Sequence, residues 1–335
     1  MEDRMLIAAL LDTIKGGGQP VLCTVVDSQG SAPRGPGARM ALLPDGVCLG
    51  TVGGGTVERL AQARASQLLA GKGMEGVELY SLGGGDAATG MVCGGTAQIS
   101  FLRLDRGDLP ALEKLSRLLE QGAPCLLVMR VTGEPPAISV YELGEVPHTL
   151  EGRMGRGPLL ERGIYTEPLC RDGVLYLFGG GHVGQALAPM LAQVGFRVVV
   201  FDSRPELARP ELFPGVERVV QGDFSCLAQQ VQPTSRDYVV VMTPGHQNDL
   251  EVLTQVLPRK PFYVGCLGSR KKGAFLRSEL ARRGIAQEQI DAIRLPIGLD
   301  LGGETPAEIA VSVTAQLIQE RARRLGGRKK GGCPA

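Results

Sequence analysis

The stretch Leu175–Glu206, LYLFGGGHVGQALAPMLAQVGFRVVVFDSRPE, decides the fold class of the C-terminal half of the chain. Gly179, Gly181 and Gly184 satisfy the pattern G-x-G-x-x-G between a run typical of a strand and a run typical of a helix. The first glycine permits a tight turn, the second lets backbone approach a pyrophosphate, and the third lets helix and strand pack closely. Free N–H groups at the start of the helix favour a phosphate. The stretch therefore predicts a dinucleotide-type βαβ unit.

Three residues near this turn are candidates for ligand binding or for shaping the turn. His182 lies inside the phosphate turn and is interpreted as a structural or gating residue rather than a base. Asp202 ends the next predicted strand, 23 residues after Gly179, where an acid accepts hydrogen bonds from a ribose. Arg204 suits either a 2′-phosphate or a solvated loop, and the sequence leaves both open. The alternative to nucleotide binding is a scaffold whose site is empty or reused.

From Gly173 onward, segments typical of strands alternate with segments typical of helices. The predicted strands are 174–178, 197–201, 238–242 and 262–265, and the predicted helices include 184–194 and 305–324. The last helix carries Thr305 at its N-cap and Glu308 in the capping-box position. This alternation predicts a Rossmann-like, doubly wound parallel sheet over 171–325. A glycine-rich basic tail, expected to be flexible, follows over 326–335.

The N-terminal part, 1–170, is predicted to be an α+β domain. Its expected strands are 21–27, 40–43, 47–49, 75–82, 96–104 and 125–132, and its expected helices are 56–69 and 108–121, after a first amphipathic helix. Pro44-Asp45-Gly46 is a strong turn signal and predicts a hairpin. The boundary between the two domains is expected near 169–173.

The composition excludes several classes of protein. Hydrophobic residues make up 43% of the 335 and charged residues 21%, which is typical of a soluble globular protein. The formal net charge of +1 provides no general attraction to nucleic acid or to an anionic membrane. The N-terminus lacks the features of a signal peptide, and no apolar run is long enough to span a bilayer. We therefore expect a cytoplasmic protein with reduced thiols.

The sequence offers few groups for proton transfer. There are three histidines, and His246 lies in TPGHQND just after a predicted strand, where ligands bind in such sheets. His246 and Asp249 are the candidate catalytic residues. The alternative is a turn in which Asn248 or Asp249 caps the next helix.

The chain resembles the XdhC/CoxI family of xanthine dehydrogenase accessory proteins in several motifs. They are 30–34 (GSAPR), 52–58 (VGGGTVE), 91–95 (MVCGG), the FGGGHVG turn, FDSRPE, TPGHQND, YVGCLGSRKK and PIGLDLGGETPAEIAVS. These motifs span most of the chain, and the weakest stretch is 106–163. The resemblance implies a maturation role, in which the protein binds molybdenum cofactor, assists its sulfuration and delivers it. The implied partners are an apo-molybdenum hydroxylase and a cysteine desulfurase.

Molybdenum cofactor is an anionic pterin phosphate with a soft, sulfur-ligated metal. The backbone at Gly53, Gly54, Gly55 and Gly94 and the charges of Arg34 and Arg39 suit its phosphate. Cys93 is the candidate ligand of molybdenum, because a thiolate is a soft donor and its loop gives it access. Gly268, Ser269 and Arg270 open a predicted helix and suit either an anion or a plain N-cap, and Lys272 is interpreted as part of a solvated first turn. Cys23, Cys125, Cys226 and Cys266 are expected to be buried packing residues.

The sequence thus favours a cofactor chaperone over an enzyme. One alternative is an NAD(P)-dependent oxidoreductase that uses His246 or Asp249. Another is a partner protein that senses NAD(P) or another nucleotide. A homodimer is expected on general grounds.

Overall fold

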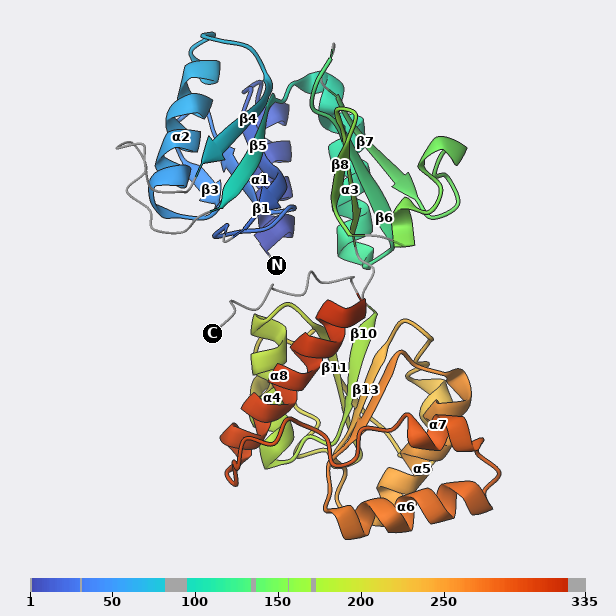
Figure 1. Cartoon of the computed structure of the whole chain (residues 1–335). Helices are drawn as coiled ribbons and strands as arrows, with labels where there is room; N and C mark the ends of the chain where they lie inside the picture. The colour runs from blue at the N-terminus through green and yellow to red at the C-terminus, as the bar shows by residue number, and fades with distance from the viewer. Residues whose placement is uncertain are drawn as a thin grey trace. The chain divides into compact units, whose positions relative to one another are not determined.

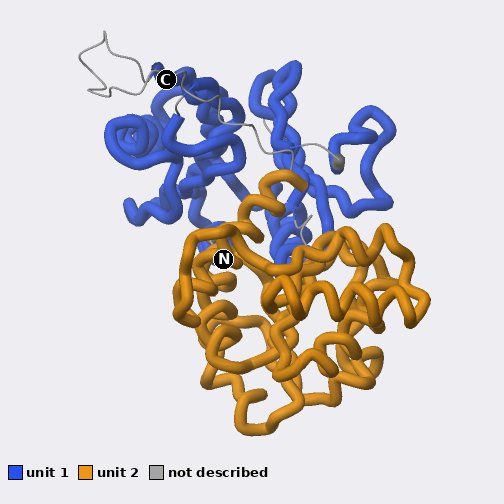
Figure 2. The backbone as a smooth tube through the Cα atoms, turned by 60° about the horizontal axis from the view of Figure 1, so that its bottom comes forward, with its two compact units in different colours: residues 1–171 blue, residues 172–335 orange. Residues whose placement is uncertain are grey.

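The computed structural model describes residues 2–30, 32–81, 95–133, 137–155, 157–169 and 173–324. The chain divides into two compact units, Met1–Arg171 and Asp172–Ala335 (Figure 2). Each unit is described by itself below. The expected tail at 326–335 and the candidate residues Cys93 and Gly94 lie outside the described residues.

The first sheet of unit 1 has five antiparallel strands in the order β3-β2-β1-β5-β4. Their bounds are β1 Val21–Gln29, β2 Arg39–Leu42, β3 Cys48–Gly50, β4 Gly76–Ser81 and β5 Thr96–Arg103. The β-branched β1 is central, and Val21–Val26 are buried because both faces of the sheet are covered. The hairpin predicted around Asp45 is confirmed by the pairing of β2 with β3.

Helices cover both faces of this sheet. Helix α2, Gly55–Leu69, packs Val57, Ala61 and Ala65 against one face. Helix α1, Glu2–Lys15, packs its apolar stripe against the other face, next to helix α3, Leu109–Gln121. Helix α3 ends at Gly122, whose φ of 61° gives the left-handed C-cap that favours glycine.

A second antiparallel sheet of unit 1, in the order β7-β6-β9-β8, lies on the far side of α3 (Figure 1). Its strands are β6 Cys125–Arg130, β7 Ala137–Glu142, β8 Leu159–Glu161 and β9 Ile164–Leu169. Short 3-10 turns occur at Arg106–Asp108, His148–Leu150 and Arg153–Gly155. The stretch 106–163, in which few family motifs were found, thus contributes α3 and most of this sheet.

Unit 2 is a Rossmann-like α/β domain, as the sequence predicts. Its five parallel strands have the order β12-β11-β10-β13-β14. They are β10 Val174–Phe178, β11 Arg197–Asp202, β12 Arg218–Gln221, β13 Tyr238–Val241 and β14 Tyr263–Cys266. The order reverses between β10 and β13, and ligands of such sheets bind at the carboxyl ends of the strands at that point. Short 3-10 turns lie at Pro210–Leu212, Leu227–Gln229 and Leu257–Arg259.

Helices pack on both faces of the parallel sheet (Figure 1). They are α4 His182–Gln193, α5 His246–Val256, α6 Arg270–Arg282, α7 Gln287–Asp291 and α8 Pro306–Arg324. Helices α4 and α8 share one face and α5, α6 and α7 the other. Helix α4 begins two residues before the predicted start at Gly184, because the turn tightens directly after Gly181.

Helix α8 is attached to the rest of unit 2 by polar contacts as well as by its core face. The side-chain amide of Gln316 accepts a hydrogen bond from the Gly298 N–H at 3.0 Å and donates one to the Gly298 carbonyl at 3.2 Å. The Tyr263 hydroxyl donates to the same amide at 2.6 Å. The predicted capping box is present, since the backbone N–H of Thr305 donates to Glu308 at 2.9 Å and that of Glu308 to the Thr305 hydroxyl at 3.3 Å.

Candidate functional site

The glycine turn after β10 has the three-part geometry that its sequence predicts. Gly179 has a φ of 118°, which favours glycine, and a Cβ there would clash with the carbonyl of Met242. A Cβ on Gly184 would clash with the carbonyl of Gly179, so this glycine lets α4 approach β10. A Cβ on Gly181 would meet no atom within 4 Å. The turn therefore leaves open space at the one position where a ligand is expected to approach the backbone.

The start of α4 borders this open position. Gly181 is the N-cap and offers no side chain to the first N–H groups of the helix. The His182 side chain is exposed at the first helical position. Unpaired N–H groups at a helix start bind anions, and a side-chain cap is not present here to compete with one.

Asp202 lies where it was predicted, at the end of β11, but its carboxylate is enclosed. The residue is fully buried and accepts a hydrogen bond of 2.6 Å from the Gly180 N–H. Arg204 donates to both carboxylate oxygens through its guanidinium. Burial alone raises the pKa of Asp202, yet these hydrogen bonds lower it below the ordinary value, so the group stays charged.

The loop after β13 carries the two candidate proton-transfer residues in very different settings. His246 is exposed at the start of α5, and its ring packs edge-on against Phe275, with 5.0 Å between centroids. Asp249 is fully buried in the first turn of α5. Its Oδ1 accepts hydrogen bonds from the Thr243 N–H at 3.1 Å and the Thr243 hydroxyl at 2.7 Å. Asp249 thus holds the loop at the end of β13.

Lys272 is a residue that the sequence interpretation missed. It was expected to lie in a solvated first turn, but its ammonium pairs with the buried carboxylate of Asp249 and donates to the Leu267 carbonyl at 2.9 Å. Ser269 is the N-cap of α6 and accepts from the Lys272 N–H at 3.3 Å. Lys272 therefore connects the loops that follow β13 and β14. Its spacing from Ser269 was the available signal, since N-cap contacts are made three residues apart.

In unit 1, three loops meet at one end of the first sheet. Gln29, the last residue of β1, pairs with Thr96, the first residue of β5, and Thr96 also pairs with Ser81, the last residue of β4. Gly50, the last residue of β3, pairs with Met40 near the start of β2. The register therefore places the loop 30–38, the turn 51–54 and the two strand ends joined by 82–95 at the same end of the sheet.

The turn at Gly53–Gly55 lies against the loop that carries Arg34. A Cβ on Gly53 would come within 3.2 Å of the Pro33 side chain and 3.8 Å of the Arg34 nitrogen. All three glycines have positive φ, and Arg34 is exposed. Glu58 reaches back from the first turn of α2 and accepts from the Gly54 N–H at 3.1 Å. This end of the sheet thus combines bare backbone with an exposed arginine.

Several expectations for charged and thiol side chains need correction. Arg39 does not lie at the glycine loops' surface, because it is buried and ion-paired with Glu167 and Asp3. Cys23, Cys125 and Cys266 are buried as expected. Cys226 is exposed instead, because it lies at the N-cap of a 3-10 turn rather than on a core strand. Burial, reinforced by Asp249, raises the pKa of Cys266 to about 12.

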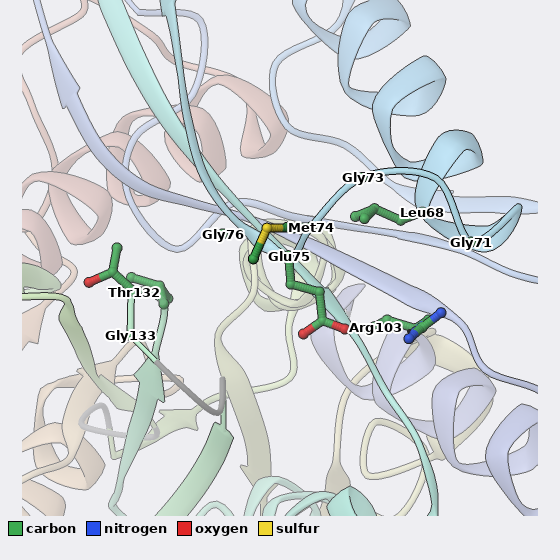
Figure 3. Close-up of a pocket in the computed structure, with 10 residues that line it drawn as sticks. Leu68, Gly71, Gly73, Met74, Glu75, Gly76, Arg103, Thr132 and Gly133 are labelled. Atoms are coloured by element: carbon green, nitrogen blue, oxygen red, sulfur yellow. Dashed lines mark ion pairs between the residues drawn. The ribbon is translucent and has the colours of Figure 1, made fainter.

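A hollow of about 670 Å³ lies at the opposite end of the same sheet, between the end of α2 and the turn after β6 (Figure 3). Glu75 and Arg103 lie in its wall, with 3.8 Å between Oε1 and Nε. The hollow contains none of the candidate residues named from the sequence.

Within the described ranges, no helix is both long and apolar enough to cross a membrane. Over the same residues, no group of three histidine, cysteine, aspartate or glutamate side chains could hold a metal ion. A metal contact through Cys93 lies outside these ranges.

Two family models match separate parts of the chain. The model described as the XdhC Rossmann domain matches residues 175–317. The model described as the XdhC and CoxI family matches residues 14–81. The glycine turn of unit 2 lies within the first range and the glycine turn of unit 1 within the second.

The chain is also similar over most of its length to individual proteins. It is 28% identical over 320 residues to the molybdenum cofactor insertion chaperone PaoD of Escherichia coli, covering 96% of this chain and 89% of that protein. It is 27% identical over 325 residues to a Bacillus subtilis protein described as a probable xanthine dehydrogenase subunit, covering 91% and 94%. It is 27% identical to the uncharacterized protein YqeB of Escherichia coli and spans only 44% of that protein's length.

A solved structure has the same fold. The crystal structure of a Bacillus halodurans protein described as a xanthine dehydrogenase superposes with a TM-score of 0.80 at 25% sequence identity. The match covers 100% of this chain and 98% of that one.

Proposed function

Because the chain belongs to the XdhC and CoxI family, we propose that it is an accessory protein that binds molybdenum cofactor and delivers it to a molybdenum hydroxylase. The similarity to an insertion chaperone over almost the whole of both chains supports this role. The cofactor is the cargo of such a protein. The proposal includes assistance in sulfuration, with a cysteine desulfurase and the apo-hydroxylase as partners. It also includes a homodimeric state and action in the cytoplasm.

The observation that carries the proposal is the gathering of bare backbone turns and Arg34 at one end of the first sheet. Peptide N–H groups of glycine turns and a guanidinium together suit the phosphate of an anionic pterin. The strand end at Thr96 lies at the same end, and Cys93 precedes it by three residues in the chain. Three residues span about 11 Å at most, so Cys93 is proposed as the soft ligand for molybdenum.

The glycine turn of unit 2 is proposed as a second anion-binding element. Gly179, Gly181 and Gly184 shape it, and the N–H groups at the start of α4 face the open position. Gly268, Ser269 and Arg270 at the start of α6 belong to the same carboxyl edge of the sheet. Asp249 is held by Thr243 and Lys272, which favours a supporting role over proton transfer. We therefore place a carrier ahead of an oxidoreductase.

The test is purification of the full chain from a host that makes molybdenum cofactor, with molybdenum measured by mass spectrometry and the pterin by fluorescence after oxidation. We expect near-stoichiometric cofactor. Cys93→Ser should reduce the retained molybdenum, whereas the control Cys226→Ser, at an exposed thiol of unit 2, should not. Protein that carries no pterin from such a host would refute the proposal, and equal molybdenum in the two variants would remove Cys93 from it.

A second pair of variants tests the phosphate contact. Arg34→Ala should lower the retained pterin, because it removes the exposed cation beside Gly53. Arg106→Ala is the matched control, since Arg106 is also exposed but follows β5 at the opposite end of the sheet. Equal losses in both variants would point to general charge rather than to a site.

A further inference from the structure

The carboxylate that would bind a ribose in unit 2 has all its acceptor positions filled. The backbone N–H and Nε of Arg204 each donate to Oδ1 of Asp202 at 2.9 Å. Nη2 of Arg204 and the N–H of Gly180 donate to Oδ2 at 2.8 and 2.6 Å. A carboxylate offers about four lone-pair positions. Four donors therefore use the whole capacity of this buried group.

Arg204 is fixed at its backbone as well as at its side chain. Its carbonyl accepts hydrogen bonds from the N–H groups of Leu207 at 3.0 Å and Ala208 at 2.9 Å. The carbonyl of Leu207 and the ring of Phe213 lie against Gly180, where a Cβ would come within 3.2 and 3.1 Å of them. The loop after β11 thus packs on the glycine turn. A ribose diol could reach Asp202 only by displacing an arginine held by both.

The same arrangement presents unused donors of Arg204 to solvent. A guanidinium has five N–H donors, and two of them bind Asp202. The other three have no partner among the residues that the structure describes, and 35% of the side chain is exposed. A planar guanidinium held from one side is well suited to bind the oxygens of a phosphate from the other.

We propose that Arg204, positioned by Asp202, makes this corner of unit 2 select a ligand that carries a phosphate group and reject one with a bare ribose. In Rossmann folds an acid at this place accepts a ribose hydroxyl, and an arginine nearby accommodates a 2′-phosphate. Here the arginine occupies the acid. The inference rests on the proposed binding role of the glycine turn and adds the chemical group that the turn's neighbour recognises.

NADPH and NADH provide a matched pair of probes, because they differ only in the 2′-phosphate. We expect calorimetric titration of the full chain to show NADPH binding at least about tenfold more tightly than NADH, the size of a charge-assisted contact. Arg204→Ala should abolish this preference. Arg204→Lys keeps a charge for Asp202, so it should fold and still lose most of the preference. Arg209→Ala is the control, because Arg209 lies in the same loop, 59% exposed, and pairs only with Glu211 among the described residues.

Equal affinity for the two nucleotides, tighter binding of NADH, or no binding of either would overturn the inference. An unchanged preference in a folded Arg204→Lys variant would overturn it as well. Retention of molybdenum cofactor is measured separately, so a protein that retains the cofactor without discriminating refutes this inference alone. A protein that discriminates but retains no pterin refutes the proposed function alone.

A nucleotide 2′-phosphate and the phosphate of a pterin share the chemistry that Arg204 would recognise. Titration of NADPH into cofactor-loaded protein distinguishes these sources. Loss of NADPH binding places the pterin phosphate at Arg204, and unchanged binding assigns the corner to a nucleotide.

Discussion

The guanidinium of Arg39 in β2 contacts the carboxylate of Glu167 in β9, and this ion pair connects the two sheets of unit 1. Only 4% of the Arg39 side chain and 10% of the Glu167 side chain are exposed. Oδ1 of Asp3 in α1 lies 3.3 Å from Nη1 of Arg39, and the Tyr165 hydroxyl donates to Glu167 at 2.9 Å. One buried cation therefore joins a helix and both sheets.

Glu167→Gln is expected to lower the free energy of unfolding by about 3 kcal/mol or more, because it leaves a buried guanidinium without its main counter-charge. Urea unfolding followed by circular dichroism measures this loss. The control is Glu113→Gln, which breaks an ion pair with Lys15 that is about half exposed on each side, and it should have little effect. Comparable losses in the two variants would contradict the prediction.

Two glycines of the same turn are expected to respond differently to alanine. Gly184→Ala should reduce stability by about 1–3 kcal/mol, because its methyl group would meet the Gly179 carbonyl. Gly181→Ala should leave the Tm nearly unchanged, since its methyl group enters open space, but should weaken NADPH binding. Thermal unfolding and calorimetry separate the two effects. A Tm loss in Gly181→Ala as large as in Gly184→Ala would show that the open position is structural.

The stability conferred by Asp202 should depend on pH. Its folded pKa is lowered, so the contribution is fully present above the unfolded value of about 3.9 and is lost as pH falls through the folded value. Asp202→Asn should therefore be less stable than the natural chain at pH 7, with the difference narrowing below about pH 4. Urea unfolding across this range checks it. A difference that stays constant would show that the charge of Asp202 is not what stabilises unit 2.

Thiol reactivity should follow exposure. Cys226 is exposed and Cys266 is buried, and burial raises the pKa of Cys266 to about 12, so its reactive thiolate is scarce at pH 8. Reaction of the native chain with a chromogenic disulfide should lose a fast phase in Cys226→Ser and lose nothing in Cys266→Ser. Both thiols should react after unfolding. Rapid labelling of Cys266 in the native chain would contradict the packing of β14.

The features that the sequence predicted are those governed by local rules. Gly179 and Gly184 had to be glycine because backbone passes within clash distance of a Cβ, and the motif encodes that. Asp202 was placed correctly because strand length and spacing set the end of β11. The capping box of α8 was read from Thr305 and Glu308 alone.

The features that the sequence did not predict depend on which segments meet in three dimensions. Whether Arg204 binds a ligand or Asp202 was open until the loop geometry was known. The pairing of Lys272 with Asp249 joins two separate loops, and that of Arg39 with Glu167 joins two sheets. No short-range pattern encodes such contacts.

The attachment of α8 has a consequence for the timing of assembly during synthesis. This helix packs beside α4, whose first turn forms the glycine site, and its Gln316 pairs with the backbone of Gly298. Every other strand and helix of unit 2 precedes α8 in the chain. A ribosome-bound chain that has emerged only as far as α7 therefore exposes the apolar side of α4, and unit 2 can hold an anion firmly only after nearly all of it has been translated.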